Sequence, residues 1–172
     1  EFQKFMRTLI GANSIESIRE IWWDIRPHPG YGTVEIRIFD SIPNLSDIKD
    51  LAGLCQALVV GMSNHYDNGT HLPYLDNWIL YENKWRATRY GVDADLIINE
   101  DGEQIPIIDE IVRTINNLSP EIEELKLSSN MDRLLNRLKN RHGYYKDQMK
   151  IYDKNKDIND VINNDIQILK NS

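Results

Sequence analysis

Polar and apolar residues alternate along residues 22–40, and this alternation predicts a β-hairpin. Successive side chains of a strand point to opposite faces. One face therefore carries alternate residues of two runs, which are Trp22, Asp24, Arg26 and His28, then Thr33, Glu35, Arg37 and Phe39. The other face of the second run carries β-branched Val34, Ile36 and Ile38, a stripe typical of a half-buried strand. Residues 29–32 (PGYG) have the composition of a turn.

A four-residue loop between the runs fixes their register. It sets three facing pairs, which are Asp24 with Arg37, Arg26 with Glu35, and His28 with Thr33. Facing opposite charges stabilise a sheet by only about 0.2–1 kcal/mol per pair, so a solvated ladder of salt bridges explains the pattern. Two arginines beside a carboxylate, flanked by Trp22 and Phe39, are also what a site for phosphate and a divalent cation requires. The pattern alone leaves both interpretations open.

Residues 46–63 predict a buried helix. Ser46 is the expected N-cap, and Asp47 and Asp50 follow in the first turn, where carboxylates favour the helix dipole. Apolar residues then recur at spacings of three and four, at Leu51, Leu54, Cys55, Leu58, Val59 and Met62. Because Cys55 lies within this stripe, a core thiol is favoured over a nucleophile.

The remaining periodicity predicts further helices and one more hairpin. Helical spacing occurs at residues 3–11 and 78–90, and two short strands at 95–99 and 104–107 flank a turn. Residues 107–170 predict a helical C-terminal region that covers one side of the sheet. Arg86 and Arg89 share a face of the helix at 78–90. They form either a solvated basic edge or a pair of guanidinium groups for an anionic ligand.

Composition narrows the class of protein. The 172 residues suffice for one domain with a core. A net charge of -7 argues against nucleic acid or an anionic membrane as a general partner. The single cysteine excludes an intrachain disulfide and fits a reducing compartment. No apolar run approaches the ~20 residues that span a bilayer, and no segment resembles a signal peptide, so we expect a cytoplasmic protein.

Familiar nucleotide and zinc motifs are missing from the sequence. The four histidines lack zinc-site spacing, and neither a phosphate-binding loop of NTPases nor a dinucleotide-binding glycine turn occurs. A nucleotide site would therefore lie on the sheet. There, carboxylates would hold Mg²⁺ and arginines would neutralise phosphate oxygens.

Three segments resemble one family. They are residues 21–40 (IWWDIRPHPGYGTVEIRIFD), 50–58 (DLAGLCQAL) and 83–91 (NKWRATRYG), and they are similar to the carboxylate-amine ligases of the second glutamate-cysteine ligase family. The resemblance is close to about residue 115 and looser beyond it. Tyr144 and Tyr145 depart from the smaller residues that the family usually carries after the glycine at 143.

The resemblance implies an α+β, glutamine synthetase-like catalytic fold, in which an antiparallel sheet has helices packed on one face and the C-terminal part is helical. It also implies that ATP phosphorylates a carboxylate, expected to be that of glutamate, and that an amine such as cysteine attacks the acyl phosphate. Carried over by position, Glu35 is a Mg²⁺ ligand, Arg37 holds the transferring phosphoryl group, and Arg26 contacts ATP phosphate. Arg89, and less securely Arg86, binds substrate carboxylate or phosphate. Asp24, Asp40 and His28 would support the arginines.

Ligases of this family are about twice as long as this chain. The resemblance therefore implies that residues 1–172 are the C-terminal part of a single catalytic domain, inactive without the N-terminal portion, which would be its partner; a homo-oligomer is also compatible. Two alternatives remain. One is a non-catalytic half-domain that binds a partner through exposed sheet edges. The other is a phosphotransfer enzyme acting on a guanidino substrate, which should carry a reactive cysteine in a loop.

Overall fold

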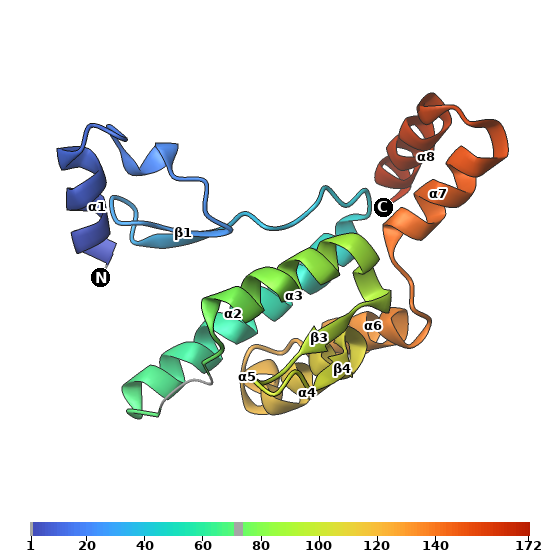
Figure 1. Cartoon of the computed structure of the whole chain (residues 1–172). Coiled ribbons are helices and arrows are strands. Elements are labelled where there is room, and N and C mark those ends of the chain that lie inside the picture. Colours follow the sequence, from blue (N-terminus) through green and yellow to red (C-terminus); the bar gives the residue numbers. More distant parts are fainter. Residues whose placement is uncertain (1, 71–73) are drawn as a thin grey trace. The chain divides into compact units, whose positions relative to one another are not determined.

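The computed structural model describes residues 2–70 and 74–172 (Figure 1). The chain divides into two compact units, with the boundary in the sequence between residues 41 and 42. The first unit contains helix α1 (Phe2–Gly11), the short 3-10 helix η1 (Ile18–Glu20) and strands β1 (Ile25–His28) and β2 (Thr33–Ile36). Helix α1 ends at the glycine expected from the sequence. It packs aromatic residues on Trp23, since the ring centroid of Phe5 lies 4.8 Å away and that of Phe2 lies 6.2 Å away.

The register predicted for the first hairpin is confirmed. Strands β1 and β2 are antiparallel, with Arg26 facing Glu35 and His28 facing Thr33. The loop is the four-residue segment 29–32, in which Gly32 has a φ of 62°, a left-handed conformation that glycine adopts without steric cost.

The apolar face of this hairpin is not half-buried as the sequence predicted. Ile25, Val34 and Ile38 are 58%, 56% and 53% exposed. No element among the described residues of the first unit covers these three side chains. Ile36, between Val34 and Ile38, is partly buried, so most but not all of the β-branched stripe is exposed.

The second unit is mainly helical. Its elements are α2 (Leu45–Asp67), α3 (Asn77–Tyr90), η2 (Gly91–Asp93), β3 (Asp95–Ile97), β4 (Gln104–Pro106), α4 (Ile107–Asn117), α5 (Ser119–Glu124), α6 (Ser128–Lys139), α7 (Tyr144–Asn155) and α8 (Ile158–Asn171). Strands β3 and β4 form the second predicted hairpin. The helical character predicted for residues 107–170 is also confirmed.

The core of this unit lies where α2 meets α4, α5 and α6 (Figure 1). Its buried apolar residues are Ala57, Ile115, Leu118, Ile122 and Met131. The C-terminal helices α5 and α6 therefore pack against α2, whereas the sequence predicted that this region would cover a sheet.

Helix α2 is buried along its smallest residues, which corrects two expectations. Its buried positions are Asp50, Gly53, Ala57 and Gly61, whereas Val59 and Met62, in the predicted apolar stripe, are about half exposed. The glycines allow a close approach, because a Cβ at Gly61 would lie 2.6 Å from a methyl carbon of Leu118. The N-cap is Asn44 rather than Ser46, since the Asn44 side chain accepts a hydrogen bond from the backbone N–H of Asp47 at 3.2 Å.

Helices combined with antiparallel hairpins confirm the α+β class. In the described residues the strands form two separate two-stranded sheets, so the larger sheet of a glutamine synthetase-like fold stays a prediction. Within the same residues, each helix is either too short or too polar to cross a bilayer.

Candidate functional site

The charged face of the first hairpin brings together three of the four predicted site residues. Arg26 and Glu35 face each other across β1 and β2. Arg37 follows the end of β2, where its backbone N–H donates to the carbonyl oxygen of Asp24 at 2.7 Å. We call Arg26, Glu35 and Arg37 the hairpin cluster.

Arg26 is the buried member of the hairpin cluster, with only 6% of its surface exposed. Its Nε and Nη2 atoms lie 2.7 Å and 2.6 Å from Oε2 of Glu35. Its Nη1 atom donates to the carbonyl oxygens of Arg19 at 3.0 Å and Ile21 at 3.2 Å. The guanidinium group thus ties the hairpin to the end of η1, and burial of its charge is compensated by a carboxylate and by carbonyl dipoles.

Glu35 lies between two guanidinium groups. Nη1 of Arg37 is 3.6 Å from Oε2 of Glu35, so the same oxygen contacts both arginines. The hydrogen bond from Arg26, followed by the charges of Arg26 and Arg37, holds the pKa of Glu35 below its usual 4.5, against the opposing effect of desolvation. The carboxylate is therefore ionised at neutral pH, and the hairpin cluster carries a net charge of +1.

Arg37 is the accessible cation of the hairpin cluster. About a third of its side chain is exposed, and its guanidinium carbon lies 5.6 Å from the ring centroid of Trp22, within the range of a cation–π contact. This contact and Glu35 restrict the orientation of Arg37 and leave part of its surface open. The arrangement suits an anionic group that approaches the hairpin from solvent.

His28 lies at the end of the same face. Its ring stacks on Tyr31 with 4.5 Å between centroids, and its Nδ1 atom is buried without a hydrogen-bond partner in the part of the chain that the structure describes. His28 contributes to the lowered pKa of Glu35, and its expected role in supporting the arginines stays a prediction.

The described residues do not fit a divalent-cation site by themselves. No group of three or more His, Cys, Asp or Glu side chains with metal-binding geometry occurs in segments 2–70 and 74–172. Glu35 contributes one carboxylate, and one of its oxygens is engaged by Arg26. A Mg²⁺ ion usually keeps several waters and takes further carboxylate or phosphate ligands, so Glu35 would need ligands from elsewhere.

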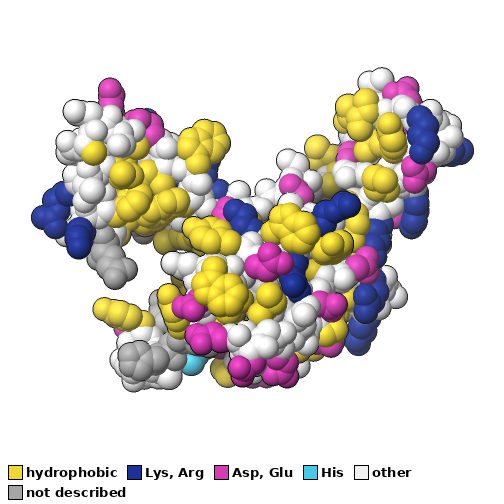
Figure 2. Space-filling model, viewed as in Figure 1, with side chains coloured by type: hydrophobic (Ala, Val, Ile, Leu, Met, Phe, Trp, Pro, Cys, Tyr) yellow, Lys and Arg dark blue, Asp and Glu magenta, His cyan; other side chains and the backbone are white. Residues whose placement is uncertain are grey.

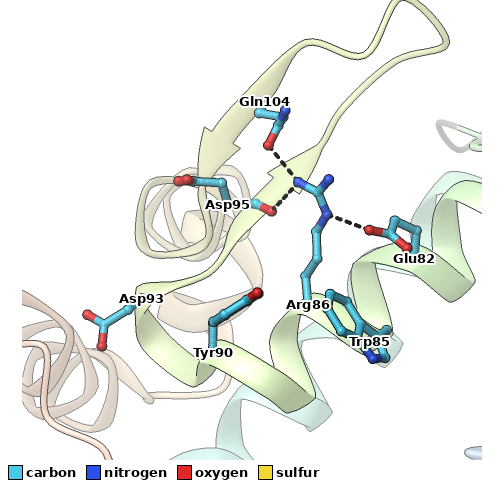
Figure 3. Close-up of a pocket in the computed structure, with 7 residues that line it drawn as sticks. All are labelled: Glu82, Trp85, Arg86, Tyr90, Asp93, Asp95 and Gln104. Atoms are coloured by element: carbon cyan, nitrogen blue, oxygen red, sulfur yellow. Dashed lines mark hydrogen bonds and ion pairs between the residues drawn. The ribbon is translucent and has the colours of Figure 1, made fainter.

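The fourth predicted residue, Arg89, belongs to α3 of the second unit. It is exposed, with its guanidinium carbon 6.0 Å from the ring centroid of Tyr90. The sequence predicted that Arg86 shares a helix face with Arg89. The guanidinium group of Arg86 is bound by other residues of the chain (Figure 3). Its Nε donates to Glu82 at 2.9 Å, and its Nη1 donates to the Asp95 carbonyl oxygen at 3.2 Å and to the Gln104 side chain at 2.5 Å. Arg86 thus ties α3 to the second hairpin.

A pocket of about 370 Å³ surrounds Arg86. Its walls are Glu82, Trp85, Arg86, Tyr90, Asp93, Asp95 and Gln104 (Figure 3). Trp85 and Tyr90 meet edge to face at 5.8 Å. Three of the lining side chains are acidic, so this pocket is a poorer match for phosphate than the hairpin cluster.

Two carboxylates of α2 anchor α6 and were not assigned this role from the sequence. Asp50 is 1% exposed; it accepts hydrogen bonds from Asn130 at 2.8 Å and from Nε of Arg133 at 2.9 Å. Asp47 pairs with Arg137 at 2.5 Å. The two aspartates of α2 are three residues apart and the two arginines of α6 are four apart, so each pair shares a helix face. No local pattern links these two pairs, which lie more than 80 positions apart in the sequence.

The two tyrosines that depart from the family pattern have defined partners. The Tyr144 hydroxyl donates to Asp47; burial, followed by this hydrogen bond, raises the pKa of Tyr144 to about 12. The Tyr145 ring lies over Gly91, where a Cβ would be 2.6 Å from the ring, and its hydroxyl is 3.3 Å from both the Tyr90 carbonyl oxygen and Asp93. Both tyrosines therefore attach the start of α7 to the rest of the second unit.

Comparison with known proteins identifies similar sequences over most of the chain. A family model described as glutamate-cysteine ligase family 2 matches residues 1–161. A Thermobifida fusca protein named "Putative glutamate--cysteine ligase 2" is 45% identical over 131 residues, which are 76% of this chain and 33% of that protein. A similarly named protein of Frankia casuarinae is 43% identical over 83% of this chain and 37% of its own length. The matched region spans about one third of these curated relatives.

Proposed function

Because the chain belongs to glutamate-cysteine ligase family 2, we propose that it carries the phosphate-handling part of an ATP-dependent carboxylate-amine ligase. The family match and the names of the relatives support a ligase function. The observation that carries the finer proposal is the hairpin cluster, in which Glu35 holds the partly exposed Arg37 beside the buried Arg26.

In this proposal Arg37 contacts the transferring phosphoryl group. Phosphoryl transfer is accelerated mainly by positioning and by charge placed where the oxygens become more negative. Arg37 meets both requirements, because Glu35 and Trp22 restrict its guanidinium group while part of it stays open.

Arg26 acts as a positioning residue in the same proposal. Its contacts with Glu35 and with the carbonyl oxygens near η1 occupy much of its guanidinium group. It contributes positive charge near ATP phosphate, as the resemblance implies, and it fixes Glu35, which in turn holds Arg37. Arg89 remains a proposed contact for a substrate carboxylate or phosphate.

The reaction proposed for the whole protein has two steps. A carboxylate oxygen, expected to be that of the glutamate side chain, attacks the γ-phosphorus of ATP, and ADP leaves. The amine, expected to be that of cysteine, then attacks the acyl carbon; an amide forms, and inorganic phosphate and a proton are released. Bound Mg²⁺ would neutralise phosphate charge, and it would need ligands from outside the described residues, such as the proposed N-terminal portion.

Binding of nucleotide to the chain tests the phosphate-handling role. Isothermal titration with ATP should show binding that weakens on addition of salt, because the contact is between charges near the surface. Arg37→Ala should abolish this binding. Arg113→Ala is a matched control, since Arg113 is an exposed arginine of α4 paired with Glu110. Equal ATP binding by wild type and Arg37→Ala, or no binding by wild type, would contradict the proposed role.

One observation favours a second candidate function, a non-catalytic interaction module. The apolar face of the first hairpin, with Ile25, Val34 and Ile38, is more than half exposed, which is typical of a surface that a partner covers. A partner that protects this face while Arg37→Ala leaves the biological activity intact would favour the module over the ligase.

The phosphotransfer alternative is not favoured. Cys55 lies in α2, and burial raises the pKa of its thiol. A reactive cysteine needs a lowered pKa and an electropositive setting, and Cys55 has neither feature.

A further inference from the structure

Trp22 displays its indole ring to solvent beside the hairpin cluster. It is 84% exposed, against 58% for Trp78 and 54% for Trp85. Hydrophobic side chains are visible on the surface of the first unit, at the upper left of Figure 2. The neighbouring Trp23 packs instead on α1, with its ring centroid 4.8 Å from that of Phe5. Of these two adjacent tryptophans, one contributes to the packing of the first unit and the other is open.

The open ring lies next to the accessible cation of the hairpin cluster. The guanidinium carbon of Arg37 is 5.6 Å from the centroid of the Trp22 ring. This contact covers little of the indole, because 84% of Trp22 stays exposed, so at least one face of the ring is open. About a third of the Arg37 side chain is exposed as well. A ligand that fits both groups carries a flat aromatic ring and an anion in one molecule.

The charge of the hairpin cluster favours a nucleotide over an apolar protein surface as this ligand. A protein surface that covered Trp22 would also cover Arg37, and burying a guanidinium group without a new partner is costly. A nucleotide supplies phosphate oxygens for Arg37 together with a base for the ring of Trp22. Aromatic side chains stack on any base, because every base has a π face.

We propose that Trp22 stacks on the base of the bound nucleotide while Arg37 contacts its phosphates. A stacked base lies about 3.5–4 Å from the ring at van der Waals contact. Because the guanidinium carbon of Arg37 is 5.6 Å from the same ring, the base would lie within about 10 Å of that carbon. The ribose and the phosphate chain of ATP can span this interval. The inference rests on the proposed phosphate-handling function and adds to it a subsite for the base.

Comparison of ATP with ribose 5′-triphosphate tests the base subsite, because the two ligands share the sugar and the phosphates and differ only in the base. Isothermal titration of the whole chain should show that ATP binds about tenfold tighter, the scale of one stack between a base and an aromatic side chain. Trp22→Ala should abolish this preference, and Trp22→Phe should keep part of it. Any change in the orientation of Arg37 affects both ligands and cancels in the ratio of their affinities.

Trp78→Ala is the matched control, since it removes an exposed tryptophan of α3 in the second unit. It should keep the wild-type preference for ATP. Tryptophan fluorescence gives a second measurement, because a stacked base quenches the emission of an indole. ATP should quench wild type and Trp78→Ala more strongly than ribose 5′-triphosphate does, and this difference should be absent in Trp22→Phe.

The outcomes separate the base subsite from the function on which it rests. Binding of neither ligand by wild type would overturn the phosphate-handling role and the base subsite together. Equal binding of the two ligands, lost for both in Arg37→Ala, would support the phosphate-handling role and overturn the stack on Trp22. A preference for ATP that survives in Trp22→Ala, or that is lost in Trp78→Ala, would overturn the stack as well, because the base would then bind elsewhere.

Discussion

Nε of Arg26 lies 2.7 Å from Oε2 of Glu35 across the first hairpin, and Nη1 of the same arginine binds backbone carbonyl oxygens near η1. One side chain therefore fixes both the register of the hairpin and the segment that precedes it. Arg26→Ala should lower the stability of the first unit by about 1–3 kcal/mol, because the buried carbonyl oxygens lose their donors. Hydrogen exchange of residues 18–36 should report this loss.

Arg37→Ala serves as the control for that experiment. Because Arg37 is about a third exposed and makes a single 3.6 Å contact with Glu35, its loss should change the stability by under about 1 kcal/mol. Equal destabilisation by the two substitutions would contradict a special structural role for Arg26.

Turnover should distinguish a catalytic role of Arg37 and Glu35 from a purely structural role in a solvated ladder of salt bridges. In the proposed full-length ligase, Arg37→Ala should reduce kcat by about a thousandfold or more, the scale of losing an arginine that stabilises a phosphoryl group. Glu35→Gln should alter the dependence of turnover on Mg²⁺ while leaving the fold intact. A loss under about tenfold for Arg37→Ala would exclude contact with the transferring group.

The 172-residue chain should not catalyse ligation by itself. The described residues supply one candidate metal carboxylate and no cluster of three, and the matched region covers about a third of the relatives. Formation of ADP in the presence of ATP, Mg²⁺, glutamate and cysteine measures this directly. Ligation at a normal enzymatic rate with no other chain present would show that residues 1–172 contain a complete site.

The stability of the first unit should depend on pH through Glu35. Its pKa is lowered in the folded state by Arg26, so ionised Glu35 stabilises the fold above the unfolded pKa near 4.5. That contribution is lost as the pH falls through the lower, folded pKa. Urea denaturation of wild type and Glu35→Gln between about pH 3 and 6 should show a difference that narrows as the pH decreases. A difference that is constant with pH would contradict the ion pair.

Gly91→Ala should loosen the attachment of α7. Gly91 has a φ of 57°, and a Cβ there would lie 2.6 Å from the Tyr145 ring, so the substitution combines backbone strain with a clash. We expect a loss of about 1–3 kcal/mol from the backbone alone. Tyr145→Ala should relieve only the clash, and the double variant should therefore be less destabilised than the sum of the single variants.

Local patterns predicted the hairpins well, because the residues that define a hairpin lie close together in the sequence. Alternation and the four-residue loop were sufficient to place Arg26 opposite Glu35. The sequence did not reveal that Arg26 is buried, since its carbonyl partners come from an irregular segment around η1 that carries no periodic signal.

Contacts between distant residues set the rest of the structure and were not predictable from local spacing. Asp50 looked like a first-turn carboxylate, but it binds Arg133, 83 positions away. Val59 looked like a core residue, but small residues determine which side of α2 is packed. Arg86 looked available to a ligand, but Gln104 and the Asp95 carbonyl oxygen, both in the second hairpin, hold it.

The glycines of α2 restrict the orientation in which that helix can pack against its neighbours. Space for a side chain is missing at Gly61 against Leu118 and is tight at Gly53 against Leu127, at 3.0 Å. Turning α2 about its axis, or sliding it by one residue, would drive a larger side chain into α5 or into the segment that precedes α6. The helix therefore has a single rotational setting, and the identity of two residues without side chains decides which apolar residues α2 presents outward.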